Sequence, residues 1–190
     1  MNYNAELARQ NAQKSFDLAV ALFPQEEWIL RETNIWVGKS RIGTTPKERA
    51  KLAWEIEQIR VFITPESMVY FLPEPEDNTL LGILSADTVI DGEIMEIKAV
   101  TGTRATLGTE FRKGFKQGVY LCERLPNVKS HSVFVRLFSD ISVGSVKAKI
   151  AGELKGRTDK GRFHCYFETL GKLFTWTYDE LRGIIGSDKA

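Results

Sequence analysis

Acidic residues and one lysine gather in a predicted hairpin, ADTVIDGEIMEIKAVTG at 86–102. The Asp-Gly pair at 91–92 lies between two alternating segments and predicts a two-residue turn, which fixes how the flanking strands pair. In that register Asp87 lies opposite Glu96, and Lys98 points to the same face. Two carboxylates with Cβ atoms about 4.5–5.5 Å apart repel each other. The hairpin therefore needs a compensating lysine, a shared proton or a metal ion.

These three side chains suit the chemistry of a divalent cation. Hard carboxylate oxygens favour Mg²⁺ or Mn²⁺, so Asp87 and Glu96 are candidate ligands. Such an ion lowers the pKa of a bound water and stabilises charge on a phosphate under attack. Lys98 would orient or deprotonate that water, or hold the phosphate. The alternative interpretation is a surface hairpin in which Lys98 forms a diagonal ion pair with an acid.

The residues after the hairpin carry groups that contact phosphates. The loop TGTRATLGT offers a glycine, hydroxyls and a cation. Its candidate backbone-binding residues are Thr101, Thr103 and Arg104. A helix predicted at 107–124 has a basic arc opposite its apolar stripe. The basic arc would bind flanking phosphates, together with the loop 155–162, and would make binding salt-dependent. Its candidate residues are Arg112, Lys113 and Lys116.

Two glycines in that helix predict close packing on the sheet. Gly114 and Gly118 flank the apolar stripe, and a residue without a side chain lets two backbones approach. Gln117 falls at the boundary between the apolar and basic arcs, from which it could reach the rim of the site. The alternative is an ordinary solvated residue at that boundary.

Charge is distributed unevenly along a chain whose net charge is only +1. Residues 1–95 hold 9 Lys/Arg and 15 Asp/Glu, residues 96–162 hold 14 and 6, and residues 163–190 hold 3 and 4. The segment net charges are therefore −6, +8 and −1. A basic middle segment indicates a surface that binds a polyanion such as nucleic acid. The alternative interpretation is a solvated face whose charges are balanced by the acidic first part of the chain.

The elements that would position these residues alternate between helix and strand. Helices are predicted at 4–22, from Thr45-Pro46 onward, at 107–124, after residues 140–142, and at the C-terminus. Strands are predicted at 67–72, 83–90, 93–100, 131–138, 162–170 and 172–178, with a further extended segment at 27–37. This order predicts an α/β (α+β) fold with a mixed central sheet. We expect a helical N-terminal extension at 1–44 and an α/β domain at 45–190.

Composition excludes several classes of protein. No apolar run approaches the roughly 18–20 residues that span a bilayer, so we expect no membrane association. The N-terminus lacks the basic and then apolar pattern of a secretory signal, so we expect a cytoplasmic location. Cys122 and Cys165 have no CxxC spacing and are expected to be free thiols. His131 and His164 do not complete a zinc pattern with them.

The series from Asp87 through Glu96-Ile97-Lys98 to a helix with Gln117 resembles the PD-(D/E)xK nuclease superfamily. The common core of that superfamily is an α-β-β-β-α-β unit, which residues 45–138 match in order. The resemblance implies that the Asp and Glu bind the metal, that the Lys acts on the water, and that the Gln supports the site.

One position departs from the pattern of that superfamily, and one is left open by it. The proline that precedes the Asp is replaced by Ala86. In some members an acid on the first core helix also contributes, and here Glu55 and Glu57 are both candidates.

A second resemblance covers residues 86–120. MEIKAVTG followed by FRKGFKQG is similar to the C-terminal toxin domains of contact-dependent growth inhibition systems, and to related domains on phages and mobile elements. It implies a nuclease that acts on tRNA in many cases, with a cognate immunity or antitoxin protein as a partner. Some of these toxins are grouped instead with barnase-, colicin- and RelE-like ribonucleases, which cleave without metal.

Three hypotheses follow from these patterns. The first is a metal-dependent nuclease that hydrolyses DNA or tRNA. The second is a metal-independent ribonuclease whose general acid or base is His131, His164 or Lys98. The third is a non-catalytic nucleic-acid-binding or protein-binding module in which the acids are structural.

Overall fold

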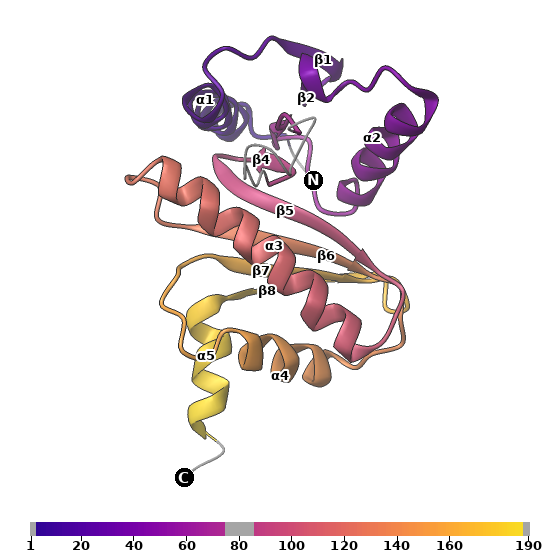
Figure 1. The fold of residues 1–190 in the computed structure, drawn as a ribbon, viewed down its shortest axis with the longest axis vertical. Helices are drawn as coiled ribbons and strands as arrows, with labels where there is room; N and C mark the ends of the chain where they lie inside the picture. The colour runs from indigo at the N-terminus through magenta and orange to yellow at the C-terminus, as the bar shows by residue number, and fades with distance from the viewer. Residues whose placement is uncertain (1–2, 75–85, 188–190) are drawn as a thin grey trace.

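One mixed sheet dominates the computed structural model, which describes residues 3–74 and 86–187. Within these residues the sheet has eight strands, and neighbouring strands in space are also neighbours in the chain (Figure 1). The strands are β1 (Trp28–Glu32), β2 (Ile35–Gly38), β3 (Val69–Phe71), β4 (Thr88–Ile90), β5 (Glu93–Val100), β6 (His131–Leu137), β7 (Arg162–Phe167) and β8 (Lys172–Thr177). The predicted α/β class with a mixed sheet is confirmed.

Helices join the parallel strand pairs, as the long connections between such strands require. The pairs β2–β3, β5–β6 and β6–β7 are parallel, and the other pairs are antiparallel. Helices α2 (Pro46–Ile59), α3 (Arg104–Arg124) and α4 (Val143–Glu153) make these three crossings, whereas α1 (Ala5–Leu22) and α5 (Tyr178–Ser187) lie at the two ends of the chain. The predicted α-β-β-β-α-β order is therefore found from α2 to β6.

The helices cover both faces of the sheet. Val89 and Ile94 pack in one apolar cluster with residues of α1 and α3, and α3, α4 and α5 form a second cluster over β5–β8. Ile90 and Met95, one position along the same strands, pack with α2 instead. This alternation follows from the two-residue period of a strand, and it places α2 on the face opposite the other helices.

A capping box fixes where α2 begins. The Thr45 hydroxyl accepts a hydrogen bond from the amide of Glu48 at 3.2 Å, and the Glu48 carboxylate accepts one from the amide of Thr45 at 2.9 Å. Pro46 occupies the first helical turn. These are the predicted start signals, and they set the phase with which the helix presents its buried residues to the sheet.

The predicted hairpin register is confirmed. Strand β4 pairs with β5 through Thr88–Met95, Val89–Ile94 and Ile90–Glu93. Asp91 and Gly92 have φ angles of 53° and 82°, which is the left-handed pair that a tight hairpin turn requires. The Asp91 carboxylate also accepts hydrogen bonds from the amide of Met68 and the hydroxyl of Ser67, which ties the turn to β3.

The segment 1–44, predicted as a helical extension with an extended segment at 27–37, contains a helix and two strands. Helix α1 matches the predicted 4–22, but β1 and β2 belong to the same sheet as the rest of the chain. The Ser15 hydroxyl in α1 donates to the carbonyl of Met68 and accepts from the amide of Gly92. Helix α1 therefore packs on the hairpin turn.

Several predicted boundaries shift by a few residues, and two of these shifts lie next to the hairpin. Helix α3 begins at Arg104, three residues before the predicted start. The prediction began late because the first buried apolar residue of the helix is Leu107. Strand β4 covers Thr88–Ile90. Residues 83–85 of the predicted strand lie outside the described residues, and with them the predicted pairing of Ser85 with Lys98. Within the described ranges, no helix combines the length and apolar content that a membrane span requires.

Candidate metal and phosphate site

The structure brings together the three hairpin residues that the sequence singled out. The Asp87 amide donates to Glu96 Oε2 at 3.0 Å, and Lys98 Nζ forms an ion pair with Glu96 Oε1. Asp87 Oδ2 accepts from the amide of Ile97 at 2.9 Å. Both Glu96 oxygens are therefore engaged by the hairpin itself, and Lys98 compensates the two acids as expected.

Helix α3 covers Glu96 completely. A Cβ atom added at Gly114 would lie 2.6 Å from Cγ of Glu96, so the helix rests directly on this side chain. Glu96 has no solvent exposure. The close approach predicted for the glycines is thereby confirmed. Gln117 lies nearly one turn further along α3 and is half-buried, and its support of the site stays a prediction.

The structure decides which acid of the first core helix joins the site. The Glu55 side chain is 7% exposed and meets the site, whereas that of Glu57 is 61% exposed. A sequence signal was present: Glu55 falls on the apolar stripe of α2 with Leu52 and Ile59, and it is an acid at a buried position.

Two further residues complete the site and were missed by sequence reasoning. Arg41 Nη2 lies 2.8 Å from Glu55 Oε2, 3.1 Å from Asp87 Oδ1 and 3.2 Å from Glu74 Oε1. One oxygen from each of these three acids lies within 4.8 Å of the others. Arg41 and Glu74 lie in connecting segments without periodicity, so no local pattern marks them.

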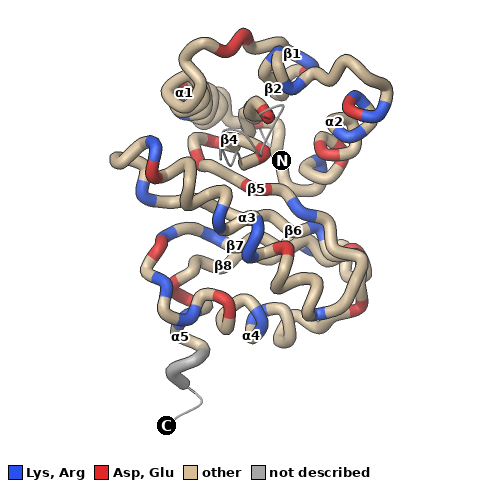
Figure 2. Tube along the Cα trace, viewed as in Figure 1, with Lys and Arg blue, Asp and Glu red and all other residues tan. Residues whose placement is uncertain are grey.

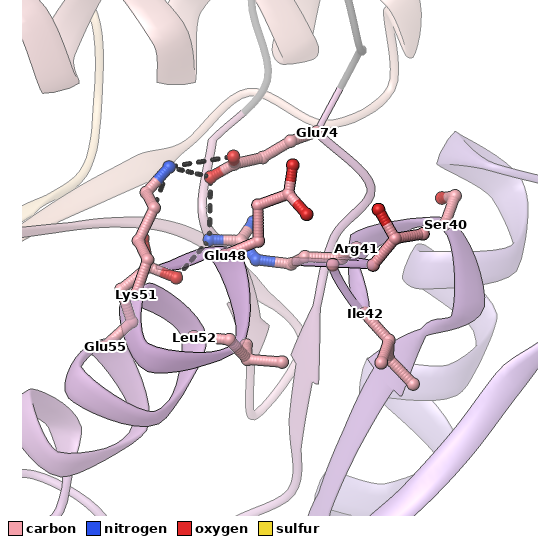
Figure 3. A pocket seen from close by; sticks show the side chains of 10 residues that line it. Ser40, Arg41, Ile42, Glu48, Lys51, Leu52, Glu55 and Glu74 are labelled. Atoms are coloured by element: carbon pink, nitrogen blue, oxygen red, sulfur yellow. Dashed lines mark hydrogen bonds and ion pairs between the residues drawn. The ribbon is translucent and has the colours of Figure 1, made fainter. Parts of the chain in front are cut away.

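A pocket of about 210 Å³ opens beside this cluster. Figure 3 shows Arg41, Lys51, Glu55 and Glu74 converging, with Lys51 bridging Glu74 and Glu55. The rest of the pocket is lined by residues of the segment before α2 and of the first turns of that helix: Ser40, Ile42, Gly43, Thr44, Glu48 and Leu52. Solvent therefore reaches the acid cluster from the α2 side.

The two facing carboxyl groups are held in different protonation regimes. Burial raises the pKa of Glu96 well above its ordinary value, and the charge of Asp87 adds to this effect. Burial acts on Asp87 as well, but Arg41, Lys98 and the Ile97 amide outweigh it and hold the pKa of Asp87 below its ordinary value. Asp87 is therefore the more acidic of the two carboxyl groups, and Glu96 is the one that is protonated first as the pH falls.

The cations of the site stay charged despite their burial. Burial alone would lower the pKa of Lys98, but Glu96 and Asp87 reverse that effect and raise it. Arg41 behaves in the same way, because burial is outweighed by Asp87 and Glu55. Burial raises the pKa of Glu55, and Arg41 opposes this rise. Asp87 therefore faces a fixed positive charge on either side.

All six predicted phosphate-binding residues are exposed, and two of them lie in ion pairs. Arg112 forms an ion pair with Glu153, and Lys113 pairs with Glu110. Figure 2 shows basic positions along α3 and in the strands and loops that follow it. The other four predicted residues are Thr101, Thr103, Arg104 and Lys116. The paired residues offer a phosphate less free charge than their sequence suggested.

The histidines lie inside apolar clusters. His131 is 1% exposed and packs edge-on against Phe115, while His164 is 5% exposed and contacts Phe62. Burial lowers the pKa of each histidine to about 4. Both rings are neutral at physiological pH and shielded from a polymeric substrate. Of the three proposed acid–base residues, His131, His164 and Lys98, it is Lys98 that lies beside the acids.

The acid cluster fits a hard divalent cation. Its donors are carboxylate oxygens, the ligand type that Mg²⁺ and Mn²⁺ prefer, and Arg41 Nη2 already marks a point at which one positive group contacts all three acids. Asp87 belongs both to this cluster and to the pair with Glu96. Of the two expected ligands, Asp87 lies in this cluster together with Glu55 and Glu74, whereas both oxygens of Glu96 are engaged by the Asp87 amide and Lys98. A metal contact of Glu96 stays a prediction.

Comparisons with known proteins give no relative: no protein-family model, no curated protein and no solved structure matches this chain.

Proposed function

We propose that this protein is a metal-dependent nuclease that hydrolyses phosphodiester bonds of DNA or tRNA. The observation that carries the proposal is the position of Asp87, which joins a three-carboxylate cluster to the Glu96–Lys98 pair. Acids that can hold a metal beside a charged lysine suit the hydrolysis of a phosphate ester. The α-β-β-β-α-β order around them agrees with the resemblance drawn from the sequence.

Each acid has a distinct part in this proposal. Glu55, Glu74 and Asp87 would hold Mg²⁺ or Mn²⁺, and Glu96 would hold Lys98 while remaining close to Asp87. The bound ion would supply a water of lowered pKa and would stabilise negative charge on the phosphate. Glu96 is fully buried under α3 and both its oxygens are engaged, so its part would be to position the Lys98 head group and the Asp87 backbone.

Lys98 is better suited to hold the phosphate than to deprotonate the water. Its pKa is raised by Glu96 and Asp87 over the opposing effect of burial, so it keeps its proton near neutral pH. A general base should have a pKa near the working pH. A protonated lysine instead donates hydrogen bonds to a phosphate oxygen and offsets the charge that develops there.

The surface around α3 would bind the rest of the nucleic acid. Arg104 and Lys116 are exposed cations on this helix, and the segment 96–162 carries a net charge of +8. Contacts of this type supply affinity without sequence specificity. The likeness of residues 86–120 to toxin domains extends the proposal to a cytoplasmic nuclease toxin from a phage or mobile element, restrained by a cognate immunity or antitoxin protein.

A matched pair of variants on one helix tests the proposal. Glu55→Gln removes a buried acid of the cluster, whereas Glu57→Gln removes an exposed acid two residues away. Both proteins and the wild type are incubated with duplex DNA and with tRNA, in Mg²⁺, Mn²⁺ or chelator. Cleavage should need metal and should fall at least about 100-fold in Glu55→Gln alone, because loss even of a residue that supports a metal ligand costs about 10–100-fold. Equal cleavage by the two variants would refute the role of the cluster.

A second function, a non-catalytic nucleic-acid-binding module, is favoured by one specific observation. Arg41 already neutralises the acid cluster, as it would in a nuclease that has lost its metal. This alternative predicts binding of DNA or RNA without turnover in any metal, with unchanged affinity in Asp87→Asn. Cleavage in chelator that leaves a 2′,3′-cyclic phosphate would instead support a metal-independent ribonuclease.

A further inference from the structure

Arg41 fills the middle of the acid cluster with one nitrogen atom. Its Nη2 contacts Glu55, Asp87 and Glu74 at 2.8, 3.1 and 3.2 Å. The side chain is only 3% exposed. Nη2 is therefore an internal cation at the point where the three carboxylates converge.

A divalent ion would need that same point. Mg²⁺ lies about 2.0–2.1 Å from its oxygen ligands. An ion bound between oxygens that lie within 4.8 Å of one another takes the volume that Nη2 holds. Two positive groups in that volume would also repel each other strongly, because little water separates them. A metal therefore cannot occupy the cluster while Nη2 contacts all three acids.

The described surroundings of Arg41 hold one of its other nitrogens, leave the third unsatisfied and include an open pocket. Nη1 donates to the carbonyls of Leu72 and Asp87 at 2.7 and 3.2 Å. Nε is buried and has no hydrogen-bond partner among the described residues, which is costly for a charged group. The pocket of about 210 Å³ is lined by Arg41 itself, so there is space beside the cluster into which the head group can turn.

We propose that Arg41 is an intramolecular competitor of the metal: its Nη2 holds the three acids together in the metal-free protein and is displaced when Mg²⁺ or Mn²⁺ binds. Arg41 thereby sets the metal affinity of the site. This inference rests on the metal site of the proposed function, and it adds that the metal-free site is closed by a residue of the chain itself.

Mn²⁺ titration calorimetry on the wild type, Arg41→Gln and Lys51→Gln tests the competition. Lys51 bridges Glu74 and Glu55 without taking the central point, so Lys51→Gln removes one nearby charge and leaves the competitor in place. If the arginine-bound state is at least about 90% populated, its removal strengthens apparent affinity about tenfold or more. We expect that gain in Arg41→Gln and a gain below about threefold in Lys51→Gln. Equal affinity in Arg41→Gln and the wild type, or weaker affinity in Arg41→Gln, would overturn the proposal.

A measurement on the wild type avoids dependence on whether the variant folds. Arg41→Gln leaves buried acids uncompensated and is expected to have a lower Tm without metal. In the wild-type protein, the ¹⁵Nε signal of Arg41 is followed by NMR during Mg²⁺ titration, with the exposed Arg60 as the internal control. The Arg41 signal should shift in step with metal saturation while Arg60 stays fixed. Saturation of the site with an unchanged Arg41 signal would contradict displacement.

The two proposals fail in distinguishable ways. Tighter Mn²⁺ binding by Arg41→Gln without cleavage of any nucleic acid would overturn the nuclease and retain the competitor. Metal-dependent cleavage with unchanged metal affinity in Arg41→Gln would retain the nuclease and overturn the competitor. Absence of Mn²⁺ binding by every variant would overturn both.

Discussion

Substitution of Gly114 by alanine probes the contact between α3 and the buried Glu96. The added Cβ would lie 2.6 Å from Glu96 Cγ, 3.1 Å from its Cβ and 3.4 Å from Val133 Cγ1. Ordinary carbon contacts lie at about 3.5–4.0 Å, so the nearest atom must retreat by about 1 Å. Overpacking of this kind costs about 1–3 kcal/mol, whereas alanine in place of glycine stabilises a helix by about 0.5–1 kcal/mol.

Mid-range values of about 2 kcal/mol for the overpacking and about 0.75 kcal/mol for the helical gain leave a net loss of about 1.3 kcal/mol in the free energy of unfolding. For a chain of this length that lowers Tm by about 3–5 °C. The matched control is Gly183→Ala in α5, where an added Cβ meets nothing within 4 Å, so only the helical gain remains. Both variants are compared by thermal and guanidinium unfolding. Gly114→Ala with a Tm equal to or above that of the wild type would refute the close packing of α3 on Glu96.

Three further predictions test the fold and its surfaces. The pKa of His131 is lowered to about 4, so its neutral form stabilises the fold fully above the unfolded pKa of about 6.5, and this stability is lost as pH falls toward 4. The loss in the free energy of unfolding reaches about 3 kcal/mol at pH 4. The free energy of unfolding of His131→Phe should therefore decline less than that of the wild type between pH 7 and pH 4. An equal decline in both proteins would contradict the burial of a neutral ring. Thr45→Ala removes the capping box of α2 and should lower the unfolding free energy by about 1 kcal/mol in chemical denaturation, and an unaltered midpoint would exclude the cap as a stabilising contact. Lys116→Gln should weaken nucleic-acid binding and reduce the slope of log affinity against log salt by about 0.9, because each released counterion contributes about that much. Arg112→Gln should have a smaller effect, since Glu153 already pairs with Arg112. A larger effect of Arg112→Gln would count against the α3 surface as the binding site.

The hairpin site could be predicted because local rules determine it. The Asp-Gly turn at 91–92 fixes the pairing of β4 with β5, and strand alternation then places Asp87, Glu96 and Lys98 on one side. The same holds for the glycines of α3, whose spacing shows where the helix meets the sheet. Local geometry leaves little choice at these positions.

The other half of the site could not be predicted, because distant segments build it. Arg41 reaches Asp87 across 46 positions in the chain, and no periodicity relates the two residues. Glu74 likewise follows a strand end without a pattern of its own. Glu55 is the intermediate case, since its place on the apolar stripe of α2 distinguishes it from Glu57 once helical phase is considered.

A count of charges along the sequence does not show which cations are free to meet a phosphate. Arg112 pairs with Glu153, 41 positions away, and Lys113 pairs with Glu110 on the same helix. A sequence count registers each cation as available, whereas the fold decides which cations already have partners. The exposed Arg104 and Lys116 are therefore the sharper candidates for phosphate contacts.

Asp87 gives the most direct test of the nuclease proposal, because it belongs to both halves of the site. Wild-type protein and Asp87→Asn are incubated with DNA and tRNA in Mn²⁺, with and without chelator, after unfolding curves confirm that both are folded. We predict cleavage by the wild type in Mn²⁺ alone, and none above background by Asp87→Asn or in chelator. Cleavage that persists in Asp87→Asn, or that the chelator leaves unchanged, would contradict metal-dependent hydrolysis at this site.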